Sequence, residues 1–142
     1  MGSNEKLAVE EDPKVVVFER LDNIKHTDEK GNITWSGRKL YKALDMPKWT
    51  EFKKLINECK KTIREAHSPA DAKKLINEYF REVSVFINVN HSGISRSKEV
   101  DDFVISPYGA HLICCANIII ETTDKNYLVN QYALEYLKQY IK

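Results

Sequence analysis

Apolar residues recur three or four positions apart along much of this chain, and this spacing places them on one face of a helix. The pattern is clearest in the apolar series that starts at Phe52 and ends at Ile63. We therefore expect about five helices that turn apolar stripes toward a core. They run from Ser36 to a break at Pro47, from Thr50 past Ile63, from Pro69 to Phe80, from Tyr108 to Ile120, and from Tyr127 to Ile141.

Serines precede three of these helices and indicate where each begins. Ser36 is expected to be an N-cap whose hydroxyl accepts from the free amides of the first turn. Ser68 is followed by a proline at the first helical position, and Asp71 can complete a capping box. Ser106 repeats this pairing of a cap with a proline. The helix after Ser106 is apolar on nearly every side, so we expect it to be buried all round at the centre of the core.

Strand signals come first near the N-terminus. Residues 15–18 are β-branched or aromatic and favour a strand. Residues 23–26 and 32–35 flank a short polar segment in which Gly31 can supply a positive φ. These two segments predict a first hairpin.

A second hairpin is expected after the third helix. Residues 83–90 alternate apolar and polar, which is the period of a strand. A polar loop at residues 90–98 separates them from a second strand at residues 100–105. A hairpin with a long polar tip that follows helices has the outline of a wing, although a flexible loop explains the same pattern.

These elements predict an α+β fold with a helix-turn-helix-like pair and a wing-like hairpin. The chain has 142 residues, which suits one domain, and we expect it to cover residues 15–142 after a mobile acidic segment at residues 1–14. No signal peptide opens the chain, and no apolar run reaches the ~18 residues of a membrane span, so we expect a cytoplasmic protein without a membrane partner. Its three cysteines fit no disulfide framework and are expected to be small apolar core residues.

Positive charge is concentrated in one part of the chain. The formal net charge is only +1, yet the segment from Arg38 to Lys74 holds eleven basic and five acidic residues, an excess of six positive charges. Such a patch can attract phosphate. A solvated helical face with ion pairs four residues apart explains the same count. The candidate DNA contacts are Arg38, Lys39, Lys42, Lys48 and Lys53 from the helices, with Arg96 and Lys98 from the hairpin.

The last expected helix has two apolar stripes. One comprises Val129, Ala133, Leu137 and Ile141, and the other comprises Tyr132, Tyr136 and Tyr140. A helix at a chain end buries one stripe in its own domain more easily than two, so the tyrosines predict a homodimer. Packing of both stripes inside the domain is the alternative.

Catalytic and metal motifs are missing from the sequence. The four histidines show no metal-ligand spacing with Cys, Asp or Glu, and the chain has no glycine-rich phosphate loop and no nucleophile elbow. The neighbours Asp101 and Asp102 point to opposite faces of a strand. We therefore expect neither an enzyme nor a bound cofactor or metal.

The chain also resembles a known family. The residues concerned are Phe18, Ile24-Lys25-His26, Gly31, Trp35-Ser36-Gly37-Arg38-Lys39-Leu40, Trp49, Phe52, Ser92-Gly93, Asp102-Phe103, Ser106, Tyr108, Leu112-Ile113 and Gln131-Tyr132. In this order they resemble the N-terminal domain of the DNA-damage-inducible protein D family, which is similar to the Bro N-terminal domains of phage antirepressors. The chain departs from that pattern at Gly37, where the family usually has alanine, at Met46-Pro47 and at Pro107. Members also continue beyond this length.

The resemblance implies a bacterial or phage DNA-associated module that acts in an SOS-type DNA damage response or in prophage regulation. The other interpretation is a protein-interaction domain that binds a recombination or repressor protein, with an incidental basic face. DNA and a regulatory protein are thus the two expected partners.

Overall fold

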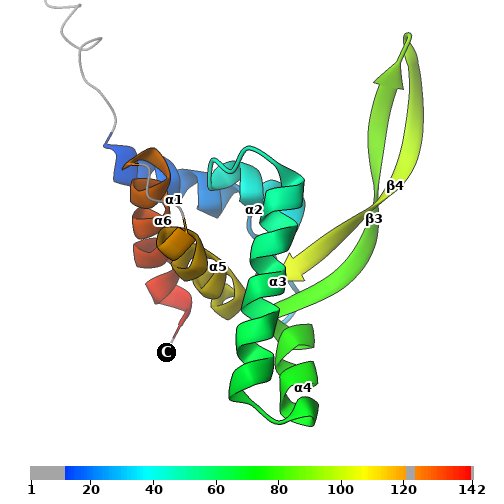
Figure 1. Cartoon of the computed structure of the whole chain (residues 1–142). Coiled ribbons are helices and arrows are strands. Elements are labelled where there is room, and N and C mark those ends of the chain that lie inside the picture. Colours follow the sequence, from blue (N-terminus) through cyan, green and yellow to red (C-terminus); the bar gives the residue numbers. More distant parts are fainter. Residues whose placement is uncertain (1–11, 121–123, 142) are drawn as a thin grey trace, which may run out of the picture.

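The computed structural model describes residues 12–120 and 124–141, and this part of the chain is α+β (Figure 1). Its helices are α1 (Pro13–Ile24), α2 (Gly37–Ala43), α3 (Trp49–Ala66), α4 (Pro69–Tyr79), α5 (Pro107–Ile120), α6 (Asp124–Leu137) and the 3-10 helix η2 (Lys138–Tyr140). Its strands are β1 (His26–Thr27), β2 (Ile33–Ser36), β3 (Phe80–His91) and β4 (Ile94–Ile105). Figure 1 shows α1, α5 and α6 grouped on one side of the molecule, whereas β3 and β4 form a ribbon that projects from the other.

The expected strand at residues 15–18 is wrong, because these residues lie in α1. Asp12 is the N-cap, its carboxylate accepts from the amide of Lys14, and Pro13 occupies the first turn. Val17 and Leu21, four residues apart, are buried against the core. The valine run favours a strand locally, but a capped start and packing against α6 override that preference. The helix α1 thus begins at Pro13, and residues 1–11 of the expected acidic segment lie outside the described residues.

Both expected hairpins are present, and one four-stranded sheet joins them. The strand order is β1-β2-β4-β3, and all described pairs are antiparallel. Gly31 has the expected positive φ of 84°, but the first hairpin keeps only a short pairing between β1 and β2. Trp35 and Ser36 at the end of β2 pair with the last residues of β4. The sheet therefore joins the first hairpin to the base of the ribbon, and so α2, which follows β2 directly, starts beside that base.

The expected polar loop at residues 90–98 is wrong as well. β3 and β4 stay paired in regular register as far as His91 and Ile94. Ser92 and Gly93 alone make the turn, with φ of 54° and 79°. Two successive positive φ values give the tight turn that matches the twist of a two-stranded ribbon. Polar composition suggested a loop, but strand pairing satisfies the backbone of these residues just as well.

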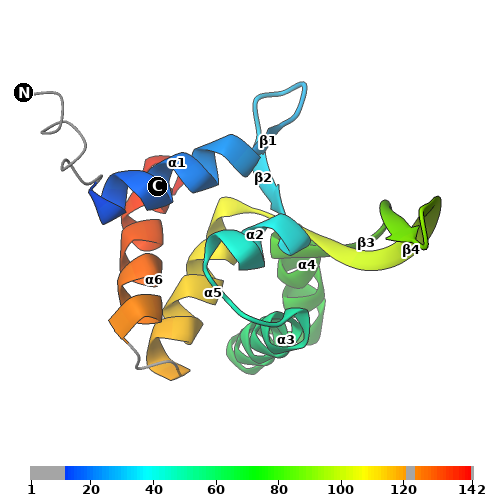
Figure 2. The ribbon, with the colours of Figure 1, turned by 90° about the horizontal axis from the view of Figure 1, so that it is seen from above.

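The core lies where α3, α5 and α6 meet α1 and the sheet (Figure 2). Trp35, Phe52 and Ile113 are fully buried there, and the indole Nε1 of Trp35 donates to the carbonyl of Leu21 over 2.9 Å. The helix α3 buries the apolar stripe that was predicted from its spacing. Ser68 caps α4 as predicted, because its hydroxyl accepts a hydrogen bond from the amide of Asp71.

The helix α5 is central, as predicted, but it is not buried all round. Ile113 and Cys114 are buried, whereas Leu112 is half-buried and Ile119 is 79% exposed. All three cysteines are free thiols, and burial raises the pKa of Cys59 to about 12. Such a thiol stays protonated near neutral pH, which agrees with an apolar role.

Both stripes of α6 and η2 pack inside the domain. Val129, Ala133 and Leu137 are buried, and so is Tyr136, which is 4% exposed. The Tyr136 ring meets Phe18 edge to face at 5.5 Å between ring centroids, and its hydroxyl donates to the Asp22 carboxylate over 2.8 Å. Tyr140 packs on Trp35, and Tyr132 also lies against the core.

The premise of an unpartnered tyrosine stripe is therefore wrong, because α1 covers it. The sequence predicts a strand at residues 15–18, so the expected fold has no helix there to cover these rings. The homodimer itself stays a prediction, without that argument behind it.

Candidate nucleic-acid interface

A groove of about 500 Å³ lies between α2 and the base of the β3–β4 ribbon. On the α2 side, Lys39 and Lys42 line it with exposed side chains. Neither lysine forms an ion pair with another residue in the described part of the chain. The complete lining is Ser36, Arg38, Lys39, Tyr41, Lys42, Val85, Phe86, Ile87 and Asp102.

The carboxylate of Asp102 on β4 fixes α2 against the ribbon. Ser36 lies at the N-cap as predicted, but its side chain makes no capping bond. Its hydroxyl instead donates to Asp102 Oδ2 over 2.7 Å, while Asp102 Oδ1 accepts from the amides of Arg38 and Phe103 over 3.0 and 2.7 Å. A buried carboxylate accepts more strongly than a hydroxyl and is favoured at the positive end of a helix. The cap of α2 thus comes from β4, which was not anticipated from the sequence.

Gly37 lets α2 approach this carboxylate. A Cβ at residue 37 would lie 3.1 Å from Asp102 Oδ1 and 3.3 Å from the ring of Trp49. Both separations are shorter than ordinary van der Waals contact, so a side chain here would push α2 away from β4. The close approach is a physical reason for glycine at residue 37.

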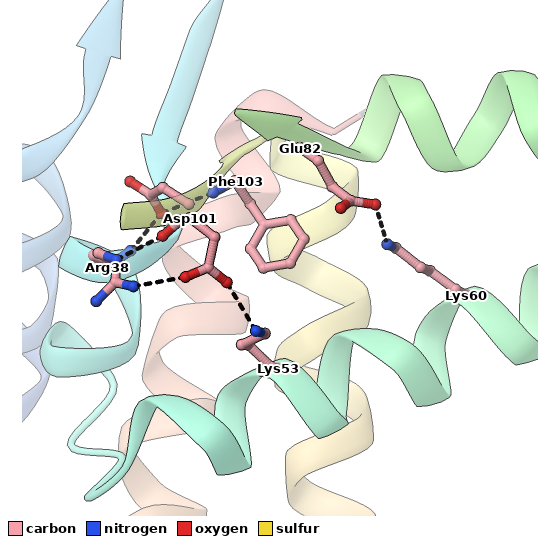
Figure 3. A network of polar contacts seen from close by, with 7 residues as sticks. Arg38, Lys53, Lys60, Glu82, Asp101 and Phe103 are labelled. Atoms are coloured by element: carbon pink, nitrogen blue, oxygen red, sulfur yellow. Dashed lines mark hydrogen bonds and ion pairs between the residues drawn. The ribbon is translucent and has the colours of Figure 1, made fainter. Parts of the chain in front are cut away.

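Two of the predicted DNA contacts share one carboxylate (Figure 3). The Arg38 guanidinium lies 2.9 Å from Asp101 Oδ1, and Lys53 Nζ lies 2.8 Å from Asp101 Oδ2. Arg38 also stacks over the Trp49 ring at 4.4 Å from its centroid. The hydrogen bond from Lys53 and then its charge, together with the bond from Arg38, lower the pKa of Asp101. Asp101 therefore neutralises part of the positive charge counted from the sequence.

Further cations of the expected patch are also held by acids. Lys60 is buried, with its Nζ 3.1 Å from Glu82 Oε2 and 5.4 Å from the centroid of the Phe103 ring (Figure 3). Lys54 pairs with Glu51 on the exposed side of α3. The excess of six positive charges between Arg38 and Lys74 is thus reduced by residues on β3 and β4 that lie outside that segment.

The register of the ribbon assigns its side chains to two faces. Ile87 pairs with Lys98, and Val89 pairs with Arg96, so these four residues share one face because residues alternate along a strand. Val85 and Ile87 of this face also line the groove beside α2. We call this the aliphatic–basic face, and it comprises Val85, Ile87, Val89, Ile94, Arg96, Lys98 and Val100.

The opposite face of the ribbon has a different character. It carries Phe86 across from Glu99 and polar pairs nearer the tip, and at its base it carries Asp101 and Glu82. The acidic groups of the ribbon therefore lie away from the aliphatic–basic face, except for the buried Asp102.

The structure thus brings together four of the seven predicted DNA contacts. Lys39 and Lys42 line the groove, and Arg96 and Lys98 continue from it along the aliphatic–basic face. Arg38 lines the groove with its charge partly neutralised. Lys53, held by Asp101, and Lys48, exposed just before α3, do not line it.

The described residues include no group of three or more His, Cys, Asp or Glu side chains that could hold a metal ion. No helix among residues 12–120 and 124–141 is long and apolar enough to cross a membrane. Comparison of the chain with protein-family models, with curated proteins and with solved structures found no match.

Proposed function

We propose that this protein is a non-enzymatic DNA-binding module whose contact surface is the groove between α2 and the ribbon. The observation that carries the proposal is the common placement of Lys39 and Lys42 with Arg96 and Lys98, at the groove and along the face that continues from it. Cations that lie along a groove and are not neutralised by neighbouring acids attract a phosphate backbone.

The distribution of acids supports this surface. Glu99, Glu82 and Asp101 lie on the opposite face of the ribbon. Asp102 lies in the groove, but it is buried and its oxygens already accept three hydrogen bonds. A phosphate at the groove would therefore meet Lys39 and Lys42, while the carboxylate of Asp101 is held by Arg38 and Lys53.

The elements proposed to contact DNA differ from those of a helix-turn-helix. The helices α2 and α3 follow one another as expected, but α3 buries its apolar stripe and pairs Lys53, Lys54 and Lys60 with acids. We assign the contacts to α2 and the ribbon. The resemblance to DNA-damage-inducible and antirepressor domains supports a role in a damage response or in prophage regulation.

A protein-interaction domain is the second candidate, and one observation favours it. Phe86 is 70% exposed on the ribbon, next to the open edge of β3. Exposed apolar side chains at a strand edge are typical of a surface that docks another protein. In this case the partner would be a recombination or repressor protein.

A titration with short DNA at two salt concentrations separates the two candidates. Four cations that each neutralise one phosphate give a slope of log K against log salt near −3.6, so affinity should fall about a hundredfold between about 50 and 200 mM salt. The variant Lys39→Gln/Lys42→Gln should reduce the magnitude of that slope by about 1.8. The matched control is Lys73→Gln/Lys74→Gln on α4, which removes the same charge outside the groove. No salt-dependent binding to DNA, or equal slopes for the two variants, would reject the proposed surface.

A further inference from the structure

Most of the ribbon stands clear of the rest of the molecule (Figures 1 and 2). Its two strands pair from Val85 and Val100 out to His91 and Ile94, and in the described part of the chain no third strand lies beside them. At about 3.3 Å per residue this free part is roughly 20 Å long. A two-stranded ribbon by itself is marginally stable in water, so an extended one is typical of an arm that gains contacts from a partner.

The aliphatic–basic face of this arm is more apolar than binding to phosphates requires. Ile87 and Val89 are exposed along β3, and Ile94 is 56% exposed beside the turn. The cations Arg96 and Lys98 lie directly across from the first two. A phosphate backbone gives aliphatic side chains no apolar partner, whereas the edges of base pairs do, through the methyl group of thymine in the major groove.

The form of DNA follows from the shape and composition of the arm. A two-stranded ribbon fits the major groove of a duplex, which is about 12 Å wide and is the groove where the thymine methyl group is displayed. Single strands are bound by stacking on aromatic side chains. By the register Phe86 lies on the opposite face, and the side chains described on the aliphatic–basic face are aliphatic or basic.

We propose that the aliphatic–basic face of the ribbon enters the major groove of duplex DNA. Ile87 and Val89 contact thymine methyl groups there, while Arg96 and Lys98 bind phosphates or guanine edges. This inference rests on the proposed function and adds to it the form of the nucleic acid and a preference for thymine-rich duplexes. The groove lysines of α2 then hold the flanking phosphates.

The test compares two duplexes of about 20 base pairs that are identical except that deoxyuridine replaces every thymidine in one of them. This replacement removes only the methyl groups from the major groove. The wild-type protein should bind the uracil duplex about fourfold or more weakly, since one buried methyl contributes roughly a fourfold change in affinity. In the variant Ile87→Ser/Val89→Ser, which removes every methyl group from these two side chains, the two duplexes should differ by less than twofold.

The matched control is Asn88→Ser, on the opposite face and outside the groove lining, which should keep the full preference of the wild type for thymine. Equal binding of both duplexes by the wild type, with a steep salt dependence retained, would overturn the groove insertion and leave the proposed function standing. Tighter binding of a single strand than of the duplex would also overturn it. Absence of DNA binding at about 50 mM salt would instead reject the proposed function. The decisive comparison uses the wild-type chain, so it does not depend on the folding of any variant.

Discussion

Asp101 is expected to restrain DNA binding, so replacing it with asparagine should strengthen binding. Its carboxylate lies within 2.9 Å of both Arg38 and Lys53. In Asp101→Asn the guanidinium keeps its place, because Arg38 Nε donates to the backbone carbonyl of residue 101 over 2.7 Å and the side chain stacks on Trp49. The substitution thus leaves Arg38 at the groove and removes the charge that neutralises it.

The size of the effect follows from counterion release. One additional cation that neutralises a phosphate steepens the salt slope by about 0.9 and tightens binding up to about eightfold near 0.1 M salt. Loss of the two ion pairs costs stability, but the Asp101 side chain is 53% exposed. Exposed pairs contribute roughly 0.2–1 kcal/mol each, so the variant should stay folded.

The pH dependence of folding stability provides a second test of the ion pairs of Asp101. The pKa of Asp101 is lowered in the folded protein, with Lys53 the main cause. Its contribution to stability is therefore present above the pKa of an unfolded aspartate, about 3.9, and is lost as the pH falls through the lower folded pKa. The variant should lose less stability than the wild type over that acid range in urea unfolding at a series of pH values.

The assay is fluorescence anisotropy with a labelled duplex at four salt concentrations. The matched control is Glu82→Gln, which makes the same change in net charge and releases Lys60 on the far face of the ribbon. We expect the control to keep the wild-type slope. If Asp101→Asn binds no more tightly than Glu82→Gln, Arg38 does not meet a phosphate and the groove assignment is refuted for that residue.

Two further predictions concern the core. Ile113→Ala should lower the free energy of unfolding by about 2–5 kcal/mol and Leu112→Ala by clearly less, because Ile113 is fully buried and Leu112 is half-buried. Denaturant titration measures both values, and the reverse order would contradict this packing. Gly109→Ala should destabilise the domain although alanine favours helices, because the new Cβ would overlap the carbonyl oxygen of Tyr79 and crowd the Phe80 ring. An unchanged melting temperature would show that α5 and α4 lie farther apart than this.

Local rules within a few residues determined most of the helices. The cap at Ser68, the proline after it and the apolar spacing along α3 each predicted an observed feature, because they depend on neighbours at most four positions away. The same local reading failed for residues 15–18, where three valines favour a strand, and for residues 90–98, where polar side chains suggested a loop. For residues 15–18 the partner that decided the outcome is α6, which lies far along the chain. For residues 90–98 it is the pairing of residues 94–98 with residues 87–91 across a two-residue turn, which side-chain polarity does not reveal.

Several features of the candidate surface were also present in the sequence. The types of residue at Lys39, Lys42, Arg96 and Lys98 were sufficient to propose a basic surface, because charge and periodicity can be read directly. Which cations remain available was decided only by the tertiary structure, since Asp101 is 63 residues from Arg38 and Glu82 is 22 residues from Lys60. Ion pairing depends on distances of a few ångströms in space, and such distances between remote residues are created by folding.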